Sequence, residues 1–298
     1  GKKMNEFKNY HPVINFVYFA FVFAFSMFFM HPACLVISFI SGFSYSVMLN
    51  GKSILKFNIL YLLPSAVIAI LINPMFNHEG MTILCYFPND NPLTLESILY
   101  GVASVVMIVC IICHFTCFNK IMTSDKFIYL LGKTIPSLSL VLSMTFRFVP
   151  RFTEQFKKVK NAKCYIERGA REKNFFRQIK FNLQVLSIMI TWSLENAIDT
   201  ADSMKSRGYG LPGRTFFSDY KFTKRDFYIL TVMFCLIIYI LVGALTKGIY
   251  FRYFPSLKGV DVSPYSISIM SAYLLFCFIP VIIEITEELK WKKLRLKI

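Results

Sequence analysis

The sequence predicts an all-α, polytopic integral membrane protein with about six transmembrane helices and long amphipathic helices outside the bilayer. Of its 298 residues, 55% are hydrophobic and only 17% are charged, whereas soluble domains carry about 25% charged residues. Several apolar stretches approach the roughly 20 residues that a spanning helix needs. Lysine and arginine gather beside these stretches, so the net charge of +16 indicates membrane orientation and anionic-lipid contact rather than nucleic-acid binding.

The candidate spans follow from the apolar runs in chain order. They are residues 13–30, 33–49, 55–72, 95–118, 227–246 and 266–284. A further apolar run, 134–149, lies between Pro136 and Pro150 and is too short to span alone.

Charged residues between the spans predict the orientation. The loop 73–94 contains Glu79 and Asp90 but no lysine or arginine, as an external loop should. The connection 247–264, with three basic residues, is the exception to this pattern. We therefore expect a multi-pass protein of the bacterial cell (plasma) membrane with both termini cytoplasmic, because basic residues flank the inner ends of the spans: Lys2, Lys3, Lys8, Lys52, Lys56, Lys120, Lys126, Lys133 and Lys290 onward.

Three regions follow: N-terminal membrane helices (1–133), a cytoplasmic helical region (134–226), and C-terminal membrane helices with a basic tail (227–298). Residues 147–226 carry 17 Lys and Arg against 8 Asp and Glu, too many charges for a lipid-embedded segment. The spacing predicts one amphipathic helix over 181–207 that contacts a partner or lies flat on the membrane. Its apolar positions recur at steps of three and four: Leu183, Leu186, Met189, Ile190, Leu194, Ala197, Ile198 and Ala201.

Two Arg-Gly pairs punctuate the cytoplasmic region, at Arg168-Gly169 and Arg207-Gly208. Glycine just past a helix end adopts the left-handed conformation without Cβ strain, and arginine in the last turn suits the helix dipole. Because the guanidinium grips carboxylates bidentately, such a tip fits an acidic groove on another protein. A capped, solvated helix end is the alternative for either pair taken alone.

The second pair carries a family resemblance. The stretch 201–210, Ala-Asp-Ser-Met-Lys-Ser-Arg-Gly-Tyr-Gly, resembles a signature of energy-coupling factor (ECF) transporter transmembrane T components, the EcfT/CbiQ family. Residues 73–80, 122–126 and 147–152 resemble the same family. The resemblance implies that Arg168-Gly169 and Arg207-Gly208 dock into two cytoplasmic ABC ATPases. Glu167 and Ser206 stand where the family has alanine, and Arg171 is an auxiliary candidate.

The resemblance implies a non-catalytic coupling subunit of a vitamin or metal-ion importer. Its partners are two ATPases, which bind the ATP, and a small hydrophobic substrate-binding membrane subunit. No cofactor or metal site of its own is expected. Cys110-Ile-Ile-Cys113-His114 fits a haem-attachment pattern but lies within an apolar run. One alternative is a stand-alone secondary transporter, disfavoured because the spans hold almost no charge. Another is a lipid-modifying enzyme, disfavoured because no catalytic constellation is visible. A third is a scaffold for another cytoplasmic complex.

Overall fold

The computed structural model describes residues 6–51, 63–77, 79–86, 92–166, 175–209, 211, 220–246, 248–259 and 263–295. The chain divides into two compact units. The bundle unit comprises residues 1–126 and 220–298, and the hairpin unit comprises residues 127–219.

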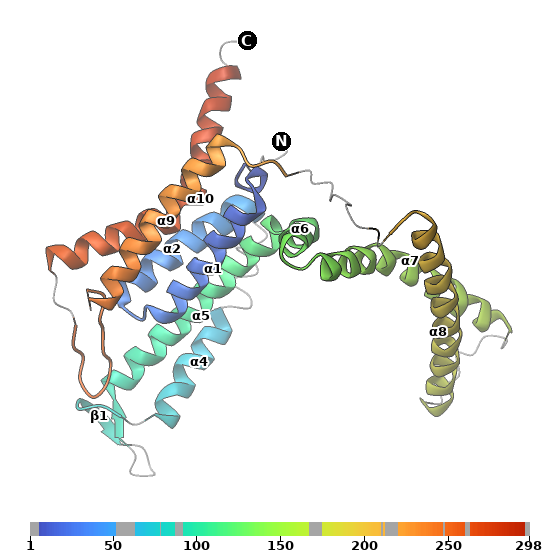
Figure 1. Ribbon diagram of the computed structural model, residues 1–298. Helices are drawn as coiled ribbons and strands as arrows, with labels where there is room; N and C mark the ends of the chain where they lie inside the picture. The colour runs from blue at the N-terminus through green and yellow to red at the C-terminus, as the bar shows by residue number, and fades with distance from the viewer. Residues whose placement is uncertain are drawn as a thin grey trace. The chain divides into compact units, whose positions relative to one another are not determined.

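The bundle unit is made of long helices that lie side by side (Figure 1). Residues 83–86 and 92–94 add a two-stranded antiparallel ribbon that the sequence did not indicate. The class is otherwise all-α, as predicted. The elements are the 3₁₀ helix η1 (Phe7–Asn9), α1 (Pro12–Phe28), α2 (Pro32–Asn50), α4 (Leu63–Phe76), β1 (Ile83–Tyr86), β2 (Pro92–Thr94), α5 (Leu95–Ile121), the start of α6 (Ser124–Thr134), α9 (Lys224–Leu245) and α10 (Pro264–Arg295).

Five of the predicted spans coincide with α1, α2, α5, α9 and α10, and the described part of the sixth, residues 63–72 of span 55–72, lies in α4; residues 55–62 of that span lie outside the described residues. Four of the described helices, α2, α5, α9 and α10, are long and apolar enough to cross a membrane. The helix α1 and the residues Ala66–Phe76 of α4 are apolar but shorter. These helices confirm a polytopic membrane protein.

Local sequence explains where the helices begin. In two places the chain reads His-Pro, and in both the histidine Nδ1 accepts a hydrogen bond from the backbone two residues on: Val13 N to His11 and Ala33 N to His31. Proline at the first helical position costs nothing there, because its missing N–H would have no helical partner. At α9, Thr223 and Asp226 form a reciprocal capping box.

The bundle core is aromatic and is tied by hydrogen bonds between helices. The ring of Tyr18 is buried beside Phe19 and Phe276. Its hydroxyl donates to the Cys277 carbonyl at 2.8 Å, and Ser41 Oγ donates to the same oxygen at 2.6 Å. Both hydroxyl groups therefore form hydrogen bonds between helices, as is usual for polar side chains between membrane helices.

Loops far apart in sequence meet at one end of the bundle. The Tyr253 hydroxyl donates to the Met30 carbonyl at 2.9 Å, and Met81 N donates to the Pro255 carbonyl at 3.1 Å. The connection 248–259 therefore packs on the α1–α2 turn and on the segment before β1. Arg252 and Lys258 of this loop therefore lie at the same end of the bundle as residues 79–86 of the predicted external loop.

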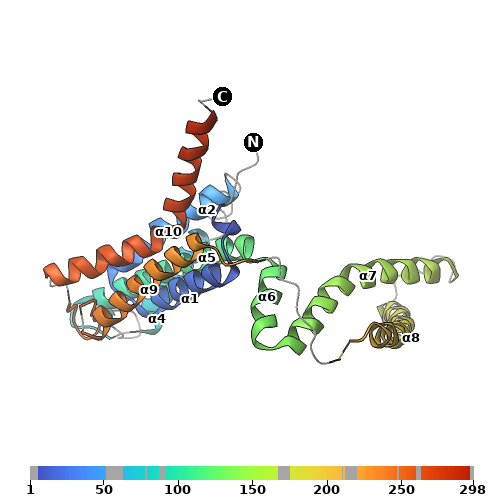
Figure 2. The same cartoon turned by 45° about the horizontal axis from the view of Figure 1, so that its top comes forward.

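The helix α10 changes direction along its length (Figure 2). It contains Pro280, which lacks an amide hydrogen and clashes with the preceding turn. Beyond the bend the helix becomes charged and ends with Lys292, Lys293 and Arg295.

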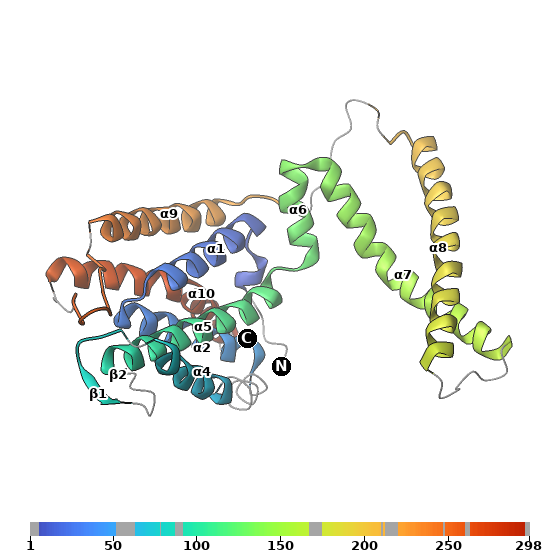
Figure 3. The same ribbon diagram turned by 90° about the horizontal axis from the view of Figure 1, so that it is seen from below.

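The hairpin unit contains the rest of α6 and two long helices, α7 (Pro136–Ile166) and α8 (Phe175–Ser206). The two cross each other, as Figure 3 shows. The helix predicted over 181–207 is thus real and begins six residues earlier. Pro150 lies within α7 rather than ending it.

Candidate functional site

The crossing of α7 and α8 builds the hairpin unit around a small apolar core. Phe181, Val185 and Met189 of α8 are buried there. Phe152 of α7 meets Trp192 of α8 edge to face, with ring centroids 5.3 Å apart. Toward the other end of the crossing, Lys163 of α7 donates to the Gln184 side chain. The two helices are therefore antiparallel where they meet, and these contacts join residues 152–164 of α7 to residues 181–192 of α8.

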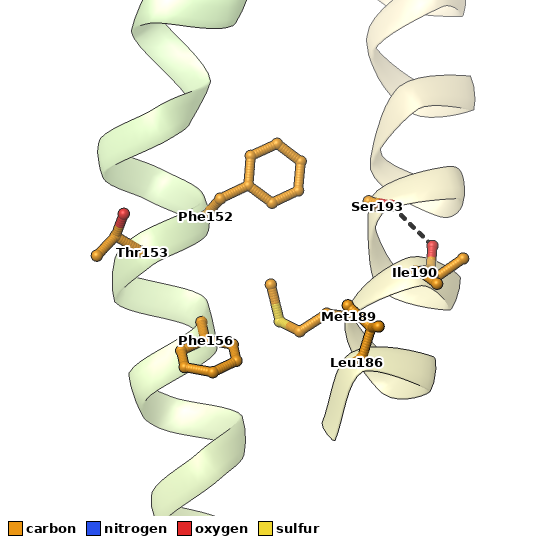
Figure 4. Close-up of a pocket in the computed structure, with 7 residues that line it drawn as sticks. All are labelled: Phe152, Thr153, Phe156, Leu186, Met189, Ile190 and Ser193. Atoms are coloured by element: carbon orange, nitrogen blue, oxygen red, sulfur yellow. Dashed lines mark hydrogen bonds between the residues drawn. The ribbon is translucent and has the colours of Figure 1, made fainter. Parts of the chain in front are cut away.

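An open pocket of about 430 Å³ lies between the two helices (Figure 4). Its only polar side chains are Thr153 and Ser193, and Ser193 Oγ already donates to the Ile190 carbonyl at 2.8 Å. A pocket with this mostly apolar lining suits an apolar side chain. The lining residues are Phe152, Thr153, Phe156, Leu186, Met189, Ile190 and Ser193.

Most of the apolar stripe predicted along α8 is exposed. Only Met189 of the large stripe residues is buried, while Leu194 is 61% and Ile198 64% exposed. Of the buried residues that hold α8 to α7, Phe181 and Val185 lie outside the stripe, and Met189 belongs to it. A continuous apolar surface of this kind marks a site of protein or membrane contact.

The second Arg-Gly pair ends α8 in the geometry expected from the sequence. Gly208 has φ of +74°. Its N–H donates to the Lys205 carbonyl at 3.0 Å, and Tyr209 N donates to the Met204 carbonyl at 3.1 Å. These two bonds define a Schellman motif. They satisfy the last carbonyls of the helix and leave Arg207 at the cap position.

Arg207 is exposed, and within the described residues no carboxylate forms a salt bridge with it. Ser206 Oγ donates to the Ser203 carbonyl at 2.9 Å, so this side chain caps its own helix. The tip of α8 therefore presents a cation whose backbone is fixed and whose charge remains unpaired by the described residues.

The first Arg-Gly pair, with Glu167, Arg168, Gly169 and Arg171, lies outside the described residues. The helix α7 ends at Ile166, immediately before it. The position of this pair at a helix end and its geometry therefore stay predictions.

The described residues hold no cluster of three His, Cys, Asp or Glu side chains able to bind a metal ion. The Cys110, Cys113 and His114 side chains are buried in the bundle, and His114 Nδ1 contacts the Cys110 carbonyl at 2.9 Å. Sequence reasoning missed the Phe152–Trp192 contact, because an edge-to-face pair between residues 40 apart leaves no periodic signal.

Comparison with known proteins assigns the family. A family model described as "Cobalt transport protein" (CbiQ) matches residues 7–216, which include most of the bundle helices and the whole of α7 and α8. This chain belongs to the CbiQ family. Membership makes it a membrane component of a transporter.

Two relatives, each described as "Energy-coupling factor transporter transmembrane protein EcfT", are similar to part of the chain. The protein from Lactobacillus helveticus (strain DPC 4571) is 34% identical over 95 residues, 31% of this chain and 34% of the relative. The protein from Lactococcus lactis subsp. cremoris (strain MG1363) is 32% identical over 93 residues, 31% and 35% respectively. This member of the CbiQ family thus aligns with about a third of the length of each.

Proposed function

We propose that this chain is the coupling subunit of an ECF-type importer. In this proposal the α7–α8 hairpin binds two cytoplasmic ABC ATPases through its arginine tips, and the membrane helices hold a separate, small hydrophobic subunit that binds the substrate. Binding and hydrolysis of ATP occur on the ATPases and move the tips. The observation that carries the proposal is the exposed Arg207, fixed at the end of α8 by the Schellman motif.

The chemistry of the tip favours an acidic docking groove. Arginine stays charged at every physiological pH and offers five donors in a planar fork. Since the helix cap fixes the backbone of Arg207, little backbone entropy is lost on binding. By the family resemblance, Arg168 and Gly169 serve the second ATPase in the same way, with Glu167, Arg171 and Ser206 in auxiliary roles.

The exposed apolar surface of α8 favours a second, hydrophobic partner. Leu194 and Ile198 continue the apolar surface beyond the pocket between α7 and α8. An ATPase groove that binds the arginine tip does not need this surface. The substrate-binding subunit, as a membrane protein with apolar faces of its own, suits it.

We further propose that the chain is non-catalytic and binds no cofactor itself. The substrate class would be a vitamin or a transition-metal ion, held by the partner subunit. In the bacterial plasma membrane both termini and the hairpin unit would face the cytoplasm, because basic residues gather at that end of the spans.

The test replaces Arg207 with glutamate in the tagged chain, expressed with its neighbouring genes and purified in mild detergent. Reversing the charge in a desolvated groove should cost about 2 kcal/mol or more of binding free energy, about thirtyfold in the dissociation constant, so ATPase recovery should fall by about tenfold or more. Immunoblotting or quantitative mass spectrometry of the eluate measures this recovery.

The matched control is Lys160→Glu, which makes the same change of charge at an exposed position of α7 away from the tip. It should leave ATPase recovery near that of the wild type. Equal recovery with Arg207→Glu and Lys160→Glu would refute the role given to Arg207. A wild-type chain that purifies without any ATPase would refute the proposed function itself.

A further inference from the structure

The N-terminal segment 6–15 of the bundle unit, here called the clasp, contacts three separate parts of the chain. It comprises η1 and the first turn of α1. Its residue Phe7 is fully buried, with its ring edge to face against Tyr18 at 5.5 Å and Tyr45 at 6.3 Å. The clasp is therefore part of the core and not a loose terminus.

The first contact is with Lys126, the last residue of the bundle unit before the chain enters the hairpin unit. Its side chain is only 3% exposed, and Nζ donates to the Lys8 carbonyl. With the Asn15 amide nitrogen turned toward the Phe7 carbonyl (3.0 Å), Asn15 Oδ1 accepts from Lys126 Nζ at 2.6 Å. The outgoing connection is thus fastened to the clasp by a buried ammonium.

The second contact is with the residues that follow the return from the hairpin unit. The Arg225 guanidinium lies over the Tyr10 ring, 4.0 Å from its centroid. Phe222 meets the His11 ring edge to face at 5.1 Å. Both connections to the hairpin unit therefore end on the same ten residues.

The third contact is with α10. The Glu284 carboxylate, 8% exposed, accepts from the backbone N–H groups of Glu6 and Phe7 at 3.3 and 3.4 Å. Since α1 continues directly from the clasp, the clasp joins both connections to two of the helices of the bundle.

Burying the Lys126 ammonium costs desolvation free energy, which a purely stabilising contact would not require. Burial, with the nearby charge of Lys8, lowers the pKa of Lys126 to about 8. An apolar side chain of the same length would hold α6 against the clasp without desolvating a charge, and such replacements are often neutral or stabilising. The ammonium instead gives a directional bond to a defined pair of oxygens.

We propose that the clasp passes movement of the hairpin unit to the membrane helices, with Lys126 and Tyr10 as positioning residues. This inference rests on the proposed function, in which ATP moves the hairpin tips. A shift of either connection would displace the clasp, and the clasp is bonded to α10 and continuous with α1. The path then runs through the Lys126 bond on the outgoing side and through the Arg225–Tyr10 and Phe222–His11 contacts on the returning side.

The test compares nucleotide responses by hydrogen–deuterium exchange in the purified complex with its ATPases. Each sample is measured without nucleotide and with Mg-ATP plus orthovanadate. One reporter is α8 and its tip (175–209), and the other is the loops at the far end of the bundle (79–86 and 248–259). The variants are Lys126→Met and Tyr10→Leu.

Both variants should keep the response of α8 and reduce the response of the far loops by roughly two- to thirtyfold, the range for residues along a coupling network. The controls are Lys120→Met and Tyr10→Phe. Lys120 also donates to a backbone carbonyl of the bundle, that of Leu49, but does not contact the clasp in the described structure, and phenylalanine keeps the ring beneath Arg225. Both controls should respond like the wild type.

Three outcomes would overturn the inference. A full far-loop response in Lys126→Met and Tyr10→Leu would show that the clasp is not the path. An equal loss in the controls would show general loosening of the bundle. A wild-type complex whose α8 does not respond to nucleotide would refute the proposed function, and this inference with it. Thermal midpoints confirm folding, and if one variant fails to fold, the other decides.

Discussion

Replacing Gly42 with alanine tests how closely α2 and α5 pack. A Cβ at this position would lie 2.6 Å from His114 Cε1 and 2.7 Å from Nδ1, well inside ordinary van der Waals distance. The imidazole is buried and its Nδ1 is engaged with the Cys110 carbonyl at 2.9 Å. The ring therefore moves away only by losing this bond, or the two helices must separate.

The overlap should cost about 1–3 kcal/mol. Alanine regains about 0.5–1 kcal/mol by its better helix propensity, so we expect a net loss of about 1–2 kcal/mol. For a unit of roughly 200 residues this lowers the midpoint of thermal unfolding by about 2–8 °C. The assay is thermal unfolding of the purified protein in detergent, followed by intrinsic fluorescence.

A second background makes the test sharper. When His114 is first changed to alanine, the overlap disappears, and Gly42→Ala should become neutral or stabilising. The two backgrounds should then differ by about 1–3 kcal/mol in the effect of Gly42→Ala, since contacting residues are not additive. The same effect in both backgrounds, or a raised midpoint in the wild-type background, would refute the packing argument.

Two further predictions concern helix ends. Gly208→Ala forces a side chain into the left-handed conformation at φ +74°. It should destabilise the end of α8 by about 1–2 kcal/mol and lower ATPase recovery. Unchanged recovery would mean that the cap is not needed for docking. Burial lowers the pKa of His31 from its usual 6.5, partly opposed by a hydrogen bond to the Gly259 backbone. Because neutral Nδ1 accepts from Ala33 N, the contribution of His31 to stability is full above pH 6.5 and is lost as the pH falls through the lowered pKa. His31→Asn keeps a capping acceptor without titrating, so its thermal midpoint should fall less than that of the wild type between pH about 7.5 and about 5; equal falls would contradict the assignment.

Local patterns made much of the fold predictable. Runs of apolar residues placed the spans, because a helix of about 20 such residues matches the thickness of the hydrocarbon core of a bilayer. The Gly208 cap was predictable, since a glycine after a long helix has a strong conformational reason to be there. These features depend on neighbours in sequence.

Features that depend on distant residues were not predictable. Lys126 was interpreted only as a cytoplasmic charge, yet its ammonium is buried beside Asn15. The alternation in 83–94 is too short to distinguish a ribbon from a loop. The stripe on α8 was recognised as amphipathic, but its period could not show that α7 packs mainly around Phe181 and Val185, outside the stripe. Which side faces a neighbour depends on tertiary contacts.

The exposed face of α8 has a consequence for how cells make this protein. Leu194 and Ile198 leave an exposed apolar surface on any copy that is not bound to its partner subunits. Such unassembled copies would tend to aggregate and to be degraded by quality-control proteases. The amount of the subunit in a cell should then track the scarcest member of the assembly, and laboratory yields should rise when all members are produced from one transcript.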